Sequence, residues 1–265
     1  MYAFTYHKPG SVGEAASLAA AHADGKLMAG GMTLLPTMKQ RLASPSDIID
    51  MGKLDELRGI KVADGAVTIG AMTRHVTVAT SADVQKAIPA LAALANGIGD
   101  PAVRNRGTCG GSIANNDPAA DYPAACLALG AKIITNKRDI AADDFFTGLF
   151  DTALKEGEIV TAVSFPIPDK ANYQKFRNPA SRYAIVGVFV AKKGADVKVA
   201  VTGAGSSGVF RQKDFEAALK ANFSAAALDG KAQSPDGLNS DIHADAEYRA
   251  HLIGVMAKRA VTAAG

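Results

Sequence analysis

The order of apolar and polar residues divides the first part of the chain into short strands and amphipathic helices. Ser11 and Glu14 have the spacing of a capping box, and Asp64-Gly65 is typical of a hairpin turn. Short apolar runs predict strands at residues 4–6, 26–29, 47–50, 60–62, 67–69, 132–135 and 158–165. Helical spacing between the runs predicts helices at residues 12–22, 34–41, 74–81, 88–96 and 118–129, with Thr73 as the predicted N-cap of the third.

Pro166 and Pro168 end the last of these strands and mark a predicted domain boundary. We expect one domain at residues 1–168 and a second at residues 171–265. The second should contain strands at residues 173–177, 184–192 and 196–202, then helices at residues 213–221 and 245–261. Because strands and helices do not alternate strictly, the pattern indicates an α+β fold.

The composition is that of a globular protein with a full apolar core. Hydrophobic residues make up 48% of the 265 residues. The net charge is only +3, and basic residues are interleaved with acidic ones, so we expect no nucleic-acid-binding surface. No apolar run is long enough to span a bilayer, and the first residues lack the features of a signal peptide. We therefore expect a cytoplasmic protein without a transmembrane segment.

Cysteines and histidines are too few and too scattered to predict a metal site. Cys109 and Cys126 are the only cysteines, and two thiols cannot hold an iron–sulfur cluster alone, so we expect both to be buried. No two histidines have ligand spacing along the sequence, and no serine has the setting of a nucleophile elbow. We expect no metal site and no catalytic side chain. The histidines are His7, His22, His75, His243 and His251.

Two glycine pairs are the strongest indication of a ligand. Gly30-Gly31-Met32-Thr33 follows a predicted strand and precedes a predicted helix. Thr108-Cys109-Gly110-Gly111-Ser112 precedes an amide pair and two acids. Glycines let a backbone approach a ligand closely, N–H groups in such turns bind anions, and carboxylates accept hydrogen bonds from sugar hydroxyls. The two segments predict a nucleotide-like ligand with a diphosphate and a polyol.

A third glycine segment matches a dinucleotide-binding fingerprint but lacks its context. Residues 203–208 have the pattern Gly-x-Gly-x-x-Gly, and Asp229 lies near the distance expected for a ribose-binding acid. The fingerprint requires a helix directly after the loop and then a second strand that leads to the acid. Residues 211–214, which follow the loop, are polar, and residues 225–228 have a low strand propensity. We therefore predict an ordinary turn.

Segments 29–36 and 108–121 resemble the two FAD-binding signatures of the molybdenum hydroxylase flavoproteins. That family includes the medium subunit of aerobic carbon monoxide dehydrogenase and the central domain of xanthine dehydrogenase. Residues 104–107, 145–148, 158–160 and 175–184 also resemble the family in order and spacing, so the resemblance covers nearly the whole chain. Many relatives have His at the position of Met32 and Ile or Val at that of Cys109, but neither difference removes a backbone N–H.

The resemblance implies a two-lobed FAD-binding domain of the vanillyl-alcohol-oxidase/PCMH type, followed by a smaller α+β domain that covers one side of the flavin. It implies non-covalent FAD, with Asn115 and Asp121 on the ribityl or ribose hydroxyls. Val160 is then expected against the ring system, and Arg177 near the pyrimidine edge, where positive charge stabilises the reduced flavin. The residues implied to hold the diphosphate are Ala29, Gly30, Gly31, Met32, Thr33, Thr108, Gly110, Gly111 and Ser112.

The resemblance further implies an oxidoreductase subunit that transfers electrons. A partner subunit with [2Fe–2S] clusters would reduce the FAD, a molybdopterin subunit would hydroxylate the substrate, and the whole would be a dimer of heterotrimers. Two alternatives stay open: a stand-alone FAD-dependent oxidoreductase, for which Cys109 is the one candidate attachment thiol, and a non-catalytic nucleotide-binding assembly protein. Arg104 and Arg106 are either surface charges or contacts of the cofactor or a subunit. For Tyr183 we favour packing over shielding of the flavin.

Overall fold

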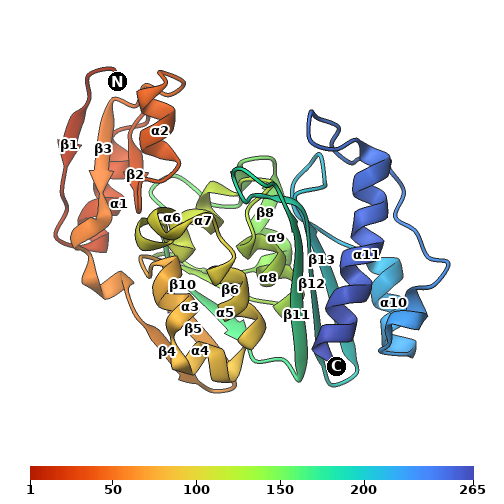
Figure 1. Cartoon of the computed structure of the whole chain (residues 1–265). Coiled ribbons are helices and arrows are strands. Elements are labelled where there is room, and N and C mark those ends of the chain that lie inside the picture. Colours follow the sequence, from red (N-terminus) through yellow and green to blue (C-terminus); the bar gives the residue numbers. More distant parts are fainter.

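The computed structural model describes residues 1–265, and its first lobe is a small sheet with two helices (Figure 1). The elements are β1 (Thr5–His7), α1 (Val12–Ala21), β2 (Lys26–Met28), α2 (Leu34–Lys39) and β3 (Asp47–Asp50). The three strands are parallel, in the order β1-β3-β2. Ser11 caps α1 through the N–H of Glu14, as predicted, but the Glu14 carboxylate accepts the N–H of Gly10 instead of closing the box on Ser11.

The middle lobe is built on a five-stranded antiparallel sheet. Its strands are β4 (Ile60–Ala63), β5 (Ala66–Gly70), β6 (Lys132–Thr135), β7 (Asp139–Ala141) and β10 (Val160–Pro166), in the order β4-β5-β10-β6-β7. Helices packed around it share a core of 32 buried residues. The remaining elements are 3-10 helices Met51–Lys53 and Asp55–Leu57, α3 (His75–Thr80), α4 (Ala82–Ala87), α5 (Pro89–Asn96), α6 (Pro101–Arg106), α7 (Cys109–Asn115), α8 (Tyr122–Leu129), α9 (Ala142–Phe145) and the hairpin β8 (Phe146–Gly148) and β9 (Asp151–Thr152).

The last lobe is a four-stranded antiparallel sheet between two layers of helices (Figure 1). Its elements are β11 (Lys170–Arg177), β12 (Ala184–Lys193), β13 (Asp196–Thr202), β14 (Phe210–Arg211), α10 (Lys213–Ala221), the 3-10 helix Ala225–Leu228 and α11 (Ala246–Ala264). The apolar run of β12 is buried on both faces because alternate side chains enter different cores. Val186, Val188 and Val190 enter the core under α11, whereas Phe189 and Ala191 enter the core that contains α8.

The predicted helix at residues 118–129 is wrong in its extent. The second glycine segment is itself helical, as α7, and α8 begins only at Tyr122. Thr108 caps α7 by accepting the N–H of Gly111, and Asn116 ends it in a left-handed conformation (φ 44°). A turn closed by the Asp117 carboxylate on the N–H of Ala119 then separates the two helices.

Thr73 does not cap α3, contrary to the sequence prediction. Its hydroxyl instead bonds the backbone N–H and carbonyl of Gly59, each at 3.0 Å. The helix begins after Arg74. Short elements with little periodicity, among them α4, α6, β7 and β14, were not predicted either. No helix of the chain combines the length and the apolar character that crossing a membrane requires.

Candidate cofactor site

The two glycine loops, about 80 residues apart in sequence, lie against each other. A side chain on Gly30 would overlap the carbonyl group of Arg106, just before the second loop. A side chain on Gly111 would come within 3.2 Å of the Ala29 side chain, in the first loop. Glycine is therefore needed at position 30, where the two backbones approach each other closely, whereas Gly111 packs tightly against the Ala29 side chain.

The first glycine loop presents a series of free backbone donors. None of the N–H groups at residues 30–33 makes a hydrogen bond within the chain. Gly31 adopts a positive φ of 73°, a conformation that turns successive N–H groups toward one side. A run of unpaired N–H groups directly before the short helix α2 is a suitable cradle for an anionic group such as a diphosphate.

The second glycine loop differs from this expectation, because most of its N–H groups are used by the chain itself. The N–H groups of Cys109 and Gly110 donate to the carbonyls of Thr73 and Ala71, at 3.0 and 2.9 Å. Those of Gly111 and Ser112 both donate to Thr108. What this loop offers a ligand is therefore the hydroxyls of Thr108 and Ser112 and a backbone surface without side chains at its glycines.

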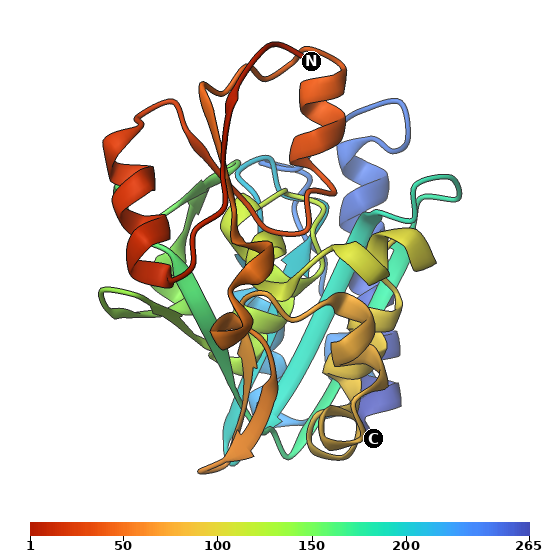
Figure 2. The same ribbon diagram turned by 90° about the vertical axis from the view of Figure 1, so that its left-hand side faces the viewer.

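Both loops line one cavity of about 720 Å³ where the three lobes meet. This volume lies within the range of roughly 300–1,000 Å³ of small-molecule and cofactor sites. Figure 2 shows the first lobe standing above the other two, which leaves the glycine loops at the junction. Of the predicted cofactor residues, the lining includes Ala29, Gly30, Gly31, Met32, Thr33, Thr108, Gly110, Gly111, Ser112, Asn115, Asp121 and Val160.

Arg177 is the one predicted cofactor residue that lies outside the cavity lining. It is the last residue of β11, and its side chain is exposed. Its positive charge nevertheless reaches the site, because it is one of the charges that oppose the rise in the pKa of the Asp121 carboxyl caused by burial. The arrangement supports a long-range electrostatic effect and not a contact.

Asp121 is held in a buried ion pair with Lys175. The carboxylate lies 3.0 Å from the Lys175 ammonium and accepts a hydrogen bond from the Tyr173 hydroxyl. Lys175 also donates to the carbonyl of Gly97 at 2.9 Å. Burial raises the pKa of Asp121, and the Lys175 ammonium opposes that shift. A ligand therefore meets a charge-balanced pair that still has acceptor lone pairs for hydroxyl groups.

The two asparagines after the second loop have different surroundings. Asn115 lines the cavity. Asn116 is buried, and its amide donates to the carbonyls of Gly148 and Asp151, both at 2.8 Å. Asn116 thus fixes the β8–β9 hairpin, and only Asn115 is available to a ligand.

A buried carboxylate fixes the loop of residues 153–159 that forms one wall of the cavity. Glu158 accepts hydrogen bonds from Arg138 Nε, the Thr135 hydroxyl and the Lys155 N–H, each at 2.9 Å. The hydrogen bond from Arg138 is the largest cause that lowers the pKa of Glu158, to about 2. Glu158 is therefore ionised at neutral pH and joins this wall to β6.

His75 also lines the cavity, although no pattern in the sequence predicts it there. It is buried against Gly107 and Tyr122, and its Nδ1 has no hydrogen-bond partner. Burial, with the nearby Arg104, lowers the pKa of His75 to about 4, so the imidazole is neutral at neutral pH. His75 is the first residue of α3, next to Arg74, which pairs with Thr108 of the second loop, and no periodicity or motif in the sequence marks it as a site residue.

The structure also shows the surroundings of three residues, Arg104, Arg106 and Tyr183, for which the sequence left two roles open. Arg104 donates to the carbonyls of Ile98 and Gly99 at 2.9 and 3.1 Å and so fixes a cavity-lining turn, whereas Arg106 is exposed. Tyr183 lines the cavity and is 48% exposed, so the packing role that we favoured from the sequence is wrong.

Both cysteines are buried and unpaired, as predicted. Burial raises the pKa of the Cys109 thiol well above its usual range. The side chain points into the core of the middle lobe. A thiol that is buried and protonated is a poor nucleophile, which argues against a covalent cofactor link at Cys109.

The fingerprint at residues 203–208 is an ordinary turn, as predicted. The short strand β14 follows it, and α10 starts only at Lys213. The 3-10 helix Ala225–Leu228 stands where the fingerprint requires a strand, and Asp229 pairs with Lys258 at the surface.

The chain matches the family described as the FAD-binding domain in molybdopterin dehydrogenase over residues 2–168. It is a member of this family. FAD is therefore the cofactor of the domain, and the chain is an oxidoreductase subunit.

Relatives and solved structures extend the similarity over the whole chain. The chain is 36% identical to the carbon monoxide dehydrogenase medium chain of Hydrogenophaga pseudoflava, covering 98% of this chain and 96% of that protein. It is also 36% identical to the nicotine 6-hydroxylase medium subunit of Paenarthrobacter nicotinovorans, covering 99% and 98%. The reconstituted CO dehydrogenase of Oligotropha carboxidovorans contains a chain that matches with a TM-score of 0.90 at 30% identity, covering 99% and 98%. The α+β fold and the FAD-binding lobes are thereby confirmed.

Proposed function

We propose that the chain is the FAD-carrying electron-transfer subunit of a molybdenum hydroxylase. It would accept electrons from the [2Fe–2S] clusters of one partner and pass them to an external acceptor, while a molybdopterin partner oxidises the substrate. The observation that carries the proposal is the series of free N–H groups at residues 30–33, which opens into a cavity of cofactor size. The similarity to proteins named medium chains supports the assignment to a multi-subunit enzyme.

The proposed contacts follow from what each residue offers. The free N–H groups of residues 30–33 bind the diphosphate, supported by the hydroxyls of Thr108 and Ser112. Asn115 and Asp121 accept hydrogen bonds from sugar-type hydroxyls, and Val160 provides an apolar surface for the ring system. For Arg177 we propose only an electrostatic effect, because it lies outside the lining.

Redox chemistry is supplied by the bound FAD, which exchanges one or two electrons. The protein's own contribution is to bind and orient it. His75 is neutral and supplies no charge, and Cys109, the one candidate attachment thiol, is buried and protonated and therefore a poor nucleophile. We propose non-covalent binding for this reason.

We also propose two domains, residues 1–168 and 171–265, and a complex that is a dimer of heterotrimers. The five-stranded sheet ends at Pro166, and the separate four-stranded sheet begins at Lys170, which supports a boundary between them. The cytoplasmic location expected from the sequence stays a prediction.

The test is to purify the chain alone and co-expressed with candidate iron–sulfur and molybdopterin subunits, and then to record absorption spectra before and after heat denaturation. We expect flavin bands and release of FAD into the supernatant. Flavin that remains in the precipitate would indicate a covalent oxidoreductase. A chain that stays colourless with added FAD would indicate a non-catalytic assembly protein.

Electron transfer needs a second measurement on the complex. We expect substrate to reduce the flavin under anaerobic conditions only when both partners are present. Flavin reduction by a substrate of the isolated chain would contradict the proposal and favour a stand-alone oxidoreductase.

A further inference from the structure

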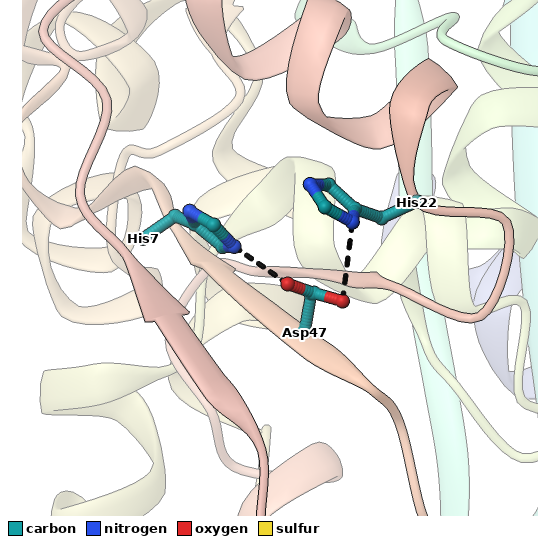
Figure 3. A group of neighbouring side chains, drawn as sticks. All are labelled: His7, His22 and Asp47. Atoms are coloured by element: carbon teal, nitrogen blue, oxygen red, sulfur yellow. Dashed lines mark hydrogen bonds and ion pairs between the residues drawn. The ribbon is translucent and has the colours of Figure 1, made fainter.

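Outside the cofactor cavity, three metal-ligating side chains meet at the edge of the first lobe. Figure 3 shows His7, His22 and Asp47 directed toward one another. The Asp47 carboxylate lies between the two rings, with one oxygen 2.6 Å from His7 Nε2 and the other 3.3 Å from His22 Nδ1. One ligand atom from each residue lies within 4.8 Å of the others.

The fold brings these residues together from three separate elements. Thr5 pairs with Asp47 in the parallel register of β1 and β3, so His7, two residues further, shares a face of the sheet with Asp47. Ile49 on the same face packs into a small core with Ala15 of α1. The end of α1 therefore places His22, its C-cap residue, beside Asp47.

We propose that His7, His22 and Asp47 bind one divalent transition-metal ion, with zinc as the best match. Two imidazole nitrogens and one carboxylate are a ligand set that zinc prefers, whereas magnesium and calcium prefer oxygen ligands alone. With zinc–ligand bonds of roughly 2.0–2.1 Å, tetrahedral ligand atoms lie about 3.3 Å apart. His22 Nδ1 already lies at this separation from Asp47 Oδ2, and His7 Nε2 needs to move less than 1 Å away from Asp47 Oδ1, so the two rings approach different oxygens of one carboxylate.

Partial exposure of the two histidines allows an ion to enter and a water molecule to complete the coordination. Asp47 is 8% exposed, whereas His7 and His22 are 22% and 36% exposed. The carboxylate is thus fixed before an ion binds, and the two imidazole rings form the solvent-exposed side of the site. Without metal, the same ring nitrogens can donate hydrogen bonds to Asp47, so the ion replaces protons at these atoms.

The ion would act as a structural clamp on the lobe that carries the first glycine loop. The small apolar cluster beneath this lobe includes only Ala15 and Ile49 of residues 1–50, so few buried apolar contacts hold β1, α1 and β3 together. β2, which leads to Gly30, pairs directly with β3. Metal binding is therefore expected to stabilise the folded lobe, because ligands assembled only in the folded chain link binding to folding.

The experiment is titration calorimetry of the FAD-loaded full chain, freed of metal by chelation, with zinc chloride at neutral pH. We expect one zinc ion per chain and a rise in the melting temperature. His7→Gln, His22→Gln and Asp47→Asn should each weaken zinc binding by at least about tenfold. His251→Gln, which removes an exposed histidine of α11, is the matched control and should bind as the wild type does.

Zinc binding that is absent, or equal in the three variants and the wild type, would overturn the proposal. The FAD content of each variant checks that it is folded. X-ray absorption at the zinc edge of the wild-type protein is independent of any variant. We expect two imidazoles and oxygen ligands, and a spectrum with sulfur ligands or without imidazole would contradict the site.

Discussion

At the scale of single residues, the site depends on positions that have no side chain. Gly30 and Gly110 each lie so close to another backbone that a methyl group has no room. The groups that a ligand uses in the first loop are main-chain N–H groups, which every residue except proline has. The chemistry at this scale is therefore set by where side chains are missing and where burial changes a charge.

Gly30→Ala is expected to weaken FAD binding by at least about tenfold, because the new methyl group overlaps the Arg106 carbonyl and pushes the two loops apart. FAD content after purification and a fluorescence titration would measure this. Gly254→Ala is the control, since nothing lies within 4 Å of its Cβ position in α11. It should keep FAD and gain roughly 0.5–1 kcal/mol from helix propensity. Equal FAD affinity in both variants would refute the steric argument.

His75 is expected to make the protein less stable in mild acid. Its pKa is lowered from 6.5 to about 4, so the unfolded chain takes up the proton first. The stabilising effect is complete above pH 6.5 and is lost as the pH falls toward 4, by about 3 kcal/mol in total. Urea unfolding across this range would measure the loss. In His75→Asn the free energy of unfolding should fall less steeply as the pH is lowered. An unchanged dependence on pH would assign the loss to other titrating groups.

At the scale of elements, local signals placed most helices and strands, and contacts with other elements decided the rest. Capping by Ser11 and the apolar runs of β10 and β12 are local. By contrast, α7 forms through a glycine-rich segment of low helix propensity, because Thr108 caps it and its N–H groups find carbonyls at residues 71 and 73. Thr73 likewise bonds Gly59 instead of capping α3.

Glu158→Gln should destabilise the protein, through the cavity wall, far more than the removal of an exposed carboxylate would. It replaces an ionised acceptor of three hydrogen bonds, from Arg138, Thr135 and Lys155, with a neutral amide, and we expect a clear loss of stability and faster FAD release. The control is Asp139→Asn. Asp139 and its partner Lys132 are each about half exposed, so this change should lower the free energy of unfolding by at most about 1 kcal/mol. Chemical denaturation and the FAD off-rate measure both. Similar losses in the two variants would contradict the assigned role.

At the scale of the whole molecule, the cavity belongs to no single lobe. The first lobe contributes one glycine loop, the middle lobe the other, and the segment before β12 adds residues 181–183. The Asp121–Lys175 pair ties the start of α8 to β11. Contacts between lobes therefore determine both the shape of the site and the stability of the protein.

Lys175→Met tests this tie. It leaves the buried Asp121 carboxylate without its counter-charge, so we expect a loss of roughly 3–5 kcal/mol and reduced FAD binding. Lys220→Met is the control, because its pair with Asp196 is exposed. Denaturant unfolding would compare them. A stability of Lys175→Met close to that of the control would show that this ion pair does not hold the lobes together.

The amino-acid pattern alone predicts the α+β class, most strand and helix positions, the two glycine loops and the buried cysteines, because periodicity, capping and glycine turns act over a few residues. Tertiary structure decided which N–H groups stay free, that Arg177 lies outside the cavity, and that His75 and Tyr183 line it. It also brought His7 and His22 to Asp47, although their spacing predicted no metal site. These features depend on contacts between residues far apart in the chain, which no local pattern encodes.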